Sequence, residues 1–220
     1  MDLTINKIEE NKQKFIELLK STNIPNIENL IDWLSNKSDF FTAPSSTIYH
    51  CNYPGGLCQH SLNVYYAAMK FLPVYKELCL PEKGAASITE ENVKICALLH
   101  DLCKTNYYAQ VEKWKKTDDN SGWIKYFTYT IDDKFPMGHG EKSLFMINHL
   151  GIHIDGISAL AIRWHMYSHD VGSMMSNYQK PAMQKSFDSY PLCVLIAQAD
   201  YFASYCMEEQ IDQTVVNRIM

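Results

Sequence analysis

The chain has 220 residues, of which 46% are hydrophobic and 20% are charged. This balance is typical of a folded globular protein and excludes an intrinsically disordered chain. The formal net charge of −5 gives no overall attraction to nucleic acid or to an anionic membrane. We see no 18-residue apolar run and no signal-like apolar segment near the N-terminus, so we expect a cytoplasmic protein without a membrane partner.

The seven cysteines are an odd number and form no CxxC pair, so we expect reduced and mostly buried thiols. We see no internal repeat, low-complexity tract or linker, and we predict one domain over residues 1–220. Its first part, 1–46, reads as an N-terminal helical extension. Apolar residues recur with helical spacing over 4–20 and again over 27–34, and Pro25 separates the two helices.

The next segment places two histidines around a turn. His50 lies in non-helical sequence before Pro54-Gly55-Gly56, and the helix that follows carries His60 on its apolar face. A further helix over 91–104 has an apolar run that is interrupted by His100 and Asp101. Burying a charge costs several kcal/mol unless it is paired or bound to a metal.

Residues 107–131 differ from the helical segments because they are rich in Tyr, Trp, Thr and Val around the polar stretch 118–122. This composition predicts a β-hairpin inserted among helices. We expect the hairpin to pack on the helices by its own aromatic face, with a lid or a wall of the substrate site as the alternative.

Three more helices are predicted over 139–150, 155–166 and 190–206, and Gly151 ends the first of them. Their apolar faces carry His139, His165 and Asp200 respectively. A polar stretch with Gly172, Asn177 and Pro181 precedes the last helix.

Six ionisable residues therefore fall on predicted core faces. A single histidine on such a face is more often a core residue with a hydrogen-bond partner, but the conjunction predicts a shared metal site. Imidazole and carboxylate together suit a divalent transition metal such as Mn, Fe, Ni, Co or Zn, and we expect one or two ions. The predicted ligands are His60, His100, Asp101, His139, His165 and Asp200.

The order H…HD…H…H…D, carried by YPGGLCQH, CALLHDLCK, GHGEK, IRWHM and AQAD, resembles the HD-domain metal-dependent phosphohydrolase superfamily. The resemblance covers roughly residues 48–206 and implies an all-α helical bundle, with a metal-binding core over 47–206 that includes the inserted hairpin. It also implies that His60, His100, Asp101 and Asp200 hold a first metal. In two-metal members the aspartate of the HD pair bridges, and two further histidines, here His139 and His165, hold the second ion.

The resemblance implies hydrolysis of a phosphomonoester or phosphodiester, of nucleotide type, by a metal-activated water. Besides Asp101, we consider Lys104 a candidate cation for the phosphoryl group and His50 a candidate acid or base. Lys142 is a weaker candidate cation. For Arg163 we expect a salt bridge.

His169 is either a pocket residue or exposed, and His149 and His153 read as surface histidines. Two other functions stay open: an HD-type di-iron oxygenase acting on a small organic molecule, and a non-catalytic metal-binding regulatory domain. The expected partner is a small phosphoester, and short oligonucleotides remain compatible with the acidic chain.

Overall fold

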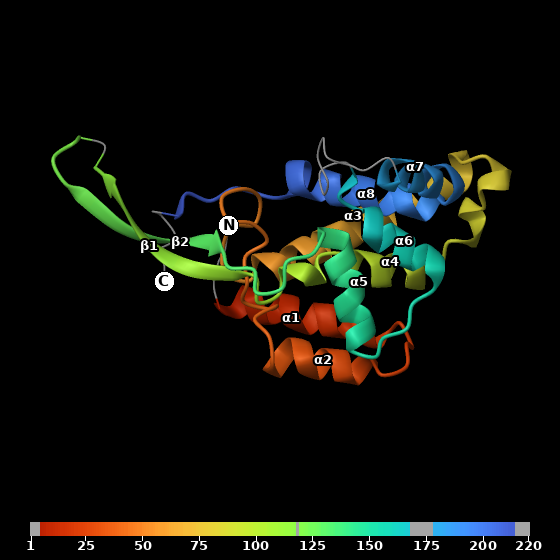
Figure 1. The fold of residues 1–220 in the computed structure, drawn as a ribbon, viewed down its shortest axis with the longest axis horizontal. Helices are drawn as coiled ribbons and strands as arrows, with labels where there is room; N and C mark the ends of the chain where they lie inside the picture. Colours follow the sequence, from red (N-terminus) through yellow and green to blue (C-terminus); the bar gives the residue numbers. More distant parts are fainter. Residues whose placement is uncertain (1–4, 118, 168–177, 214–220) are drawn as a thin grey trace.

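The computed structural model describes residues 5–117, 119–167 and 178–213 (Figure 1). Within these ranges the chain is mostly helical, with eight α-helices and one two-stranded antiparallel sheet. The helices are α1 (Ile5–Lys20), α2 (Ile27–Asn36), α3 (Gly56–Leu78), α4 (Glu90–Leu99), α5 (His139–His149), α6 (Gly156–Trp164), α7 (Gln179–Ser189) and α8 (Pro191–Phe202). The strands are β1 (Tyr108–Lys116) and β2 (Trp123–Ile131). Short helical turns cover Pro81–Lys83, Ala85–Ser87 and Leu102–Lys104, and a π-helical turn covers Ala203–Met207.

The core lies around α3, which packs against α4 and α8, while α6 packs on α8 and α5 packs on α6. Leu57, Leu98, Leu99 and Ile196 from these helices are completely buried. On the other side of the core, α1 packs against α2, α3 and α4 (Figure 1). No helix in the described part of the chain is long and apolar enough to cross a membrane.

All seven cysteines are free, and five of them are buried, as their helical positions predict. Cys79 is partly buried and Cys206 is exposed. The thiols therefore contribute to the structure mainly as small apolar side chains.

Two capped helices run side by side toward the centre of the molecule. A capping box between Thr89 and Asn92 opens α4, and the Asp155 carboxylate accepts hydrogen bonds from the backbone amides of Ile157 and Ser158 at the start of α6. The Asn92 side-chain amide also donates to Asp155 Oδ2 at 3.0 Å. The beginnings of α4 and α6 are thus tied together.

The polar stretch before the last helix contains α7, which the apolar pattern did not indicate. This helix buries only Met183 and Ser186, so it has almost no apolar stripe for a sequence pattern to reveal. Pro181 lies in its first turn, where a missing backbone N–H is tolerated. Gly172, Asn177 and His169 lie outside the described residues.

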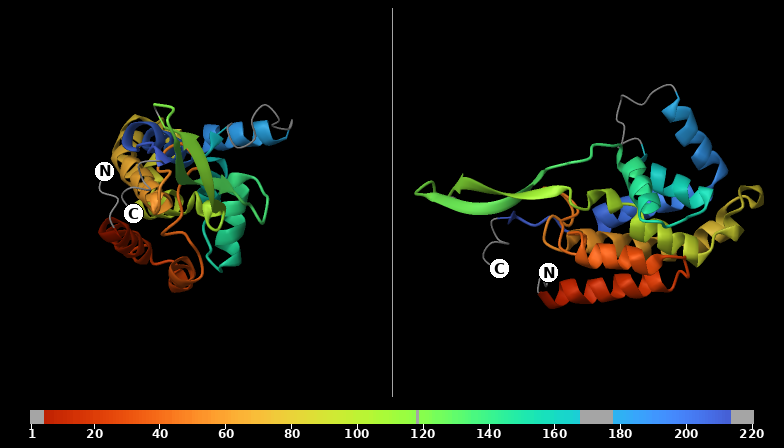
Figure 2. Two further views of the ribbon diagram at one scale, coloured as in Figure 1. Left: turned by 90° about the vertical axis from the view of Figure 1, so that its left-hand side faces the viewer. Right: turned by 60° about the horizontal axis from the view of Figure 1, so that its bottom comes forward.

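The hairpin forms within residues 107–131 as expected, but its predicted packing is wrong. Figures 1 and 2 show β1 and β2 extending away from the helices, with only the base of the hairpin near them. Trp114 and Trp123 are 57% and 62% exposed. A strand alternates in the same way whether its aromatic face meets a core or solvent, so the sequence pattern does not separate the two arrangements.

Candidate metal centre

The six predicted ligands come together at one place, where several helices begin or end. His100 and His165 directly follow the last residues of α4 and α6, and His139 is the first residue of α5. His60 lies in the second turn of α3. Asp200 comes from α8. Ligands at helix ends can converge on one point because the helix axes need not be parallel there.

Close approach of α5 to α6 depends on a glycine. A Cβ atom at Gly140 would lie 2.2 Å from the backbone oxygen of Arg163, far inside van der Waals contact. The Ser143 hydroxyl, one turn further along α5, donates to the backbone oxygen of His100 at 2.6 Å and accepts from Cys103 N at 3.0 Å. These contacts fix His139 next to the HD pair.

One carboxylate oxygen of Asp101 belongs to a first group of ligands. Asp101 Oδ2 lies 3.4 Å from His60 Nε2 and 3.5 Å from His100 Nε2. Asp200 Oδ1 completes this group, at 3.2 Å from His60 Nε2. Both imidazoles and Asp101 are buried, and the Asp200 side chain is largely buried.

The other oxygen of the same carboxylate belongs to a second group. Asp101 Oδ1 lies 3.5 Å from His139 Nε2 and 3.5 Å from His165 Nε2. Asp101 is therefore the residue shared by both groups, with one oxygen directed to each.

The hydrogen bonds of the histidines direct their Nε2 lone pairs toward the aspartates. His100 Nδ1 lies 2.8 Å from the carbonyl oxygen of Ala97, and His165 Nδ1 lies 2.7 Å from that of Ile162. A carbonyl only accepts, so each Nδ1 carries a proton, and in its neutral form each ring offers Nε2 as an acceptor. Such backbone anchoring is typical of metal-bound histidine.

Two observations fit a cation between these groups. His60 Nε2 and His100 Nε2 lie 3.2 Å apart, and two lone pairs at this distance repel one another unless a proton or a metal lies between them. Among the described residues, the buried Nε2 of His165 has no hydrogen-bond partner. Among the predicted ligands, two sets of three residues have ligand atoms close enough to hold a metal ion. One set is His60, His100 and Asp200, and the other is His100, Asp101 and His165.

Lys104 partly neutralises the acidic centre. Its ammonium lies 2.6 Å from Asp101 Oδ2, and both side chains are buried. Burial opposes ionisation of Asp101, yet Lys104 and His100 hold the pKa of this carboxyl well below its usual range. Burial also opposes protonation of His60, but Glu208 and the aspartates raise its pKa well above the usual value. The centre therefore favours added positive charge.

Glu208, which was not among the predicted site residues, lies just beyond the predicted core. Its side chain is fully buried and accepts from His60 Nδ1 at 3.0 Å and from Asn63 Nδ2 at 3.0 Å. Against the cost of burial, His60 and His50 lower the pKa of Glu208. The only sequence signal was an acidic pair, Glu208-Glu209, eight residues after Asp200, and no periodic pattern extends to it.

His50 lies beside this centre rather than within the aspartate groups. Its Nδ1 is 2.7 Å from Glu208 Oε2, and its ring lies 4.8 Å from the His60 ring. Burial lowers the pKa of His50, although Glu208 opposes this shift. The side chain is 20% exposed, so His50 sits at the edge of the centre.

The weaker candidates are held by other partners. Lys142 pairs at 2.5 Å with Asp133, which is not one of the predicted ligands. Arg163 pairs with Glu141 at 2.6 Å, as expected, and also stacks over the ring of Trp164. His149 and His153 are exposed.

Comparisons with protein families, with curated proteins and with solved structures find no match to this chain. The structure itself shows a mostly helical fold with a buried cluster of histidines and aspartates that could hold a metal ion.

Proposed function

We propose that this chain is a metal-dependent phosphohydrolase of the HD-domain superfamily that hydrolyses a nucleotide-type phosphomonoester or phosphodiester. The observation that carries the proposal is the position of Asp101 between two histidine groups. Each of its oxygens lies 3.4–3.5 Å from imidazole nitrogens of a different group. This arrangement supports a site for two metal ions, which would share Asp101 as a ligand.

The chain's own residues divide the work in this proposal. A divalent metal, when bound, supplies activated water near neutral pH and polarises a phosphoryl oxygen. His60, His100 and Asp200 would hold the first ion with Asp101, and His139 and His165 would hold the second. Lys104 fixes the orientation of the Asp101 carboxylate through the contact at 2.6 Å. Its fixed positive charge also favours an anionic substrate.

His50 is the proposed proton donor or acceptor. Glu208 engages its Nδ1, which leaves Nε2 as the ring nitrogen available to exchange a proton with a substrate oxygen. Its partial exposure suits a group that meets substrate at the rim of the centre. Glu208 orients His50 and His60 together, because one carboxylate accepts from both rings.

The test compares hydrolysis by the wild type and by Asp101→Asn with Mn²⁺ or Ni²⁺ added. The substrates are p-nitrophenyl phosphate, bis-p-nitrophenyl phosphate and a panel of nucleotides. Asparagine keeps the side-chain volume and a carbonyl acceptor for Lys104, but it removes the bridging charge. We expect metal-dependent turnover by the wild type and a loss of at least 100-fold in the variant, as for other residues essential to a metal site.

Asp32→Asn, at an exposed position on α2, is the matched control for purification and for a contaminating phosphatase. Full activity in Asp101→Asn would remove this carboxylate from the reaction. Consumption of O₂ by an iron-loaded protein that does not hydrolyse phosphoesters would contradict the proposed reaction class.

A further inference from the structure

The two faces of the hairpin have different surroundings. In the β1–β2 register, Trp114 pairs with Lys125 and Lys116 pairs with Trp123. Directly opposed residues of an antiparallel pair share a face, and alternate residues follow them. One face, here called the outer face, therefore carries Tyr108, Gln110, Glu112, Trp114, Lys116, Trp123, Lys125, Phe127, Tyr129 and Ile131.

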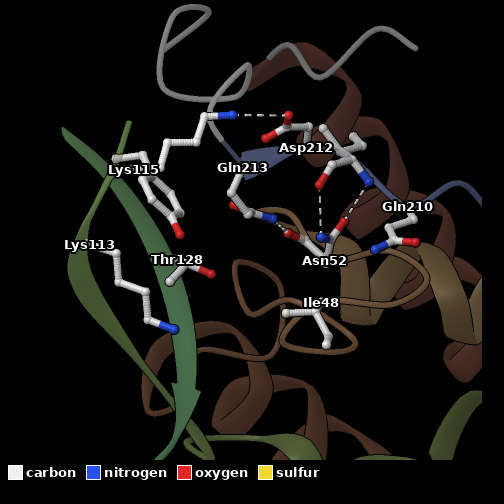
Figure 3. A pocket seen from close by; sticks show the side chains of 10 residues that line it. Ile48, Asn52, Lys113, Lys115, Thr128, Gln210, Asp212 and Gln213 are labelled. Atoms are coloured by element: carbon white, nitrogen blue, oxygen red, sulfur yellow. Dashed lines mark hydrogen bonds and ion pairs between the residues drawn. The ribbon is translucent and has the colours of Figure 1, made fainter. Parts of the chain in front are cut away.

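The opposite face lies against the end of the described chain. Figure 3 shows Lys115 directed toward Asp212, and the two side chains form an ion pair at 3.6 Å. Asn52 holds this segment in place, because its side chain exchanges two hydrogen bonds with the backbone of Ile211. A groove of about 470 Å³, lined by Lys113 and Thr128 among others, remains between the hairpin and this segment.

The distal part of the outer face, in contrast, is open, whereas at its base Tyr108 and Tyr129 are partly buried and the Tyr108 hydroxyl donates to the backbone oxygen of Ser45. Trp114, Trp123 and Ile131 are 57%, 62% and 57% exposed, and Phe127 is 39% exposed. In the right view of Figure 2 no element of the described chain lies beside the distal part of the hairpin. Exposed apolar side chains gathered on one surface mark an interaction site.

Lysines stand between the aromatic rings of this face. Lys116 Nζ lies 5.9 Å from the centre of the Trp123 ring, and Lys125 Nζ lies 5.6 Å from that of Phe127. Lysine is depleted from protein–protein interfaces, whereas aromatic rings alternating with cations form the usual platform for single-stranded nucleic acid. Successive cross-strand pairs on one face are about 7 Å apart along the strand.

The charge of the hairpin also differs from that of the molecule. Its two strands hold four lysines and one glutamate, a formal charge of +3. Asp118 and Asp119 between the two strands reduce the charge of residues 108–131 to +1, and with −5 for the whole chain the other residues carry −6. The strands of the hairpin are thus a basic and aromatic surface on an acidic protein, which complements a ligand with phosphates and flat rings.

We propose that the outer face binds a single-stranded oligonucleotide, with bases stacked on Trp114 and Trp123 and with a phosphate near Lys116, since Lys125 pairs with Glu112 at 2.6 Å. The base of the hairpin adjoins the metal centre, since the Tyr107 ring lies 6.3 Å from the His139 ring. The hairpin therefore begins beside the metal centre and extends away from it. Cleavage of a bound oligonucleotide rests on the proposed function, but its binding does not.

The experiment measures fluorescence anisotropy of labelled oligo-dT and oligo-U, each roughly 12 nucleotides long, with the full chain in EDTA at low salt. We expect saturable binding that weakens as salt increases, because bound phosphates release counterions. The double variant Trp114→Ala/Trp123→Ala is expected to bind at least tenfold more weakly, since each stacked base contributes about 1–3 kcal/mol.

Two control variants distinguish the loss of base stacking from a loss of folded structure. Trp114→Tyr/Trp123→Tyr keeps both rings and is expected to retain most of the affinity. Tyr178→Ala removes an aromatic ring that is 88% exposed on another part of the surface and is expected to change nothing.

Absence of binding by the wild type, or equal binding by the double alanine variant, would overturn the proposal. So would a wild-type dimer that becomes monomeric in the alanine variant, because the outer face would then be a protein interface. Binding in EDTA without cleavage after Mn²⁺ is added would count against the phosphohydrolase and leave this inference standing. Hydrolysis of p-nitrophenyl phosphate without oligonucleotide binding would support the phosphohydrolase and contradict the proposed binding face.

Discussion

The Asp101 carboxylate is surrounded by Lys104 and by histidine rings whose orientation is fixed by hydrogen bonds from Nδ1. Lys104 holds one oxygen, and histidines anchored through Nδ1 present Nε2 to both. Glu208 gives His60 the same anchoring that backbone carbonyls give His100 and His165. A buried carboxylate outside the ligand set therefore sets the orientation of a proposed ligand.

Glu208→Gln tests this role. Glutamine keeps the shape but carries no charge to stabilise the Nδ1–H of His60, so we expect metal affinity to fall roughly 10–100-fold while the helical content is unchanged. Titration of apo-protein with Mn²⁺ or Ni²⁺ by calorimetry gives the affinity, and circular dichroism gives the helical content.

The neighbouring substitution Glu209→Gln is the matched control, because the side chain of Glu209 is exposed. It is expected to leave metal affinity unchanged. Equal affinities in all three proteins would show that Glu208 does not orient His60.

Among the helices, the arrangement of α4, α5 and α6 explains why the two histidine groups meet. The beginnings of α4 and α6 are tied through Asn92 and Asp155, and each helix ends directly before a histidine. The rings of His100 and His165 consequently lie 4.8 Å apart. Gly140 allows α5 to approach close enough to add His139.

Gly140→Ala is expected to separate α5 from α6. The added methyl group would overlap the backbone oxygen of Arg163, so we expect the free energy of unfolding to fall by roughly 1–3 kcal/mol. Because His139 belongs to the second group, metal stoichiometry should fall as well. Gly156→Ala, where the space around the new Cβ is open, should leave both properties nearly unchanged. Urea denaturation and metal analysis provide the two measurements, and wild-type values for Gly140→Ala would contradict the close-packing explanation.

Asp155→Ala removes the cap of α6 and is expected to lower the free energy of unfolding by about 0.5–2 kcal/mol at pH 7. Burial raises the pKa of Asp155, but hydrogen bonds from Ser158 and Ile157 outweigh it and leave the pKa lowered. The ionised cap therefore stabilises the fold above the unfolded-state pKa of about 3.9, and this contribution is lost as pH falls through the folded-state value.

Urea denaturation between pH 7 and pH 3 should thus show that the difference in the free energy of unfolding between wild type and Asp155→Ala becomes smaller as the pH falls. Asp155→Asn retains a cap that does not titrate, so its stability relative to Asp155→Ala should be independent of pH. A constant gap between wild type and Asp155→Ala would show that the ionised form of Asp155 is not what stabilises α6.

For the molecule as a whole, periodic apolar patterns were enough to predict most helices and to place His60, His100, His139, His165 and Asp200 on inward faces. Those positions follow from helical geometry, because a residue on an apolar stripe points where its neighbours point. The pattern did not indicate α7, which buries little, or Glu208, which follows the last helix in irregular backbone.

The sequence did not predict the distances between the ligands. The contact of Gly140 with α6 depends on how whole helices cross, and the exposed outer face of the hairpin depends on what lies beside it. A strand pattern encodes alternation but not the neighbour on either side. The expected packing of the aromatic hairpin failed for this reason.

The most direct test of the account is elemental analysis of the protein after purification without chelator or added metal. We predict about one to two equivalents of a transition metal per chain, with Mn, Fe, Ni, Co or Zn as the candidates, and a marked loss in Asp101→Asn. Protein that contains no transition metal, and that takes up none of these ions when they are supplied, would contradict a metal centre built on Asp101.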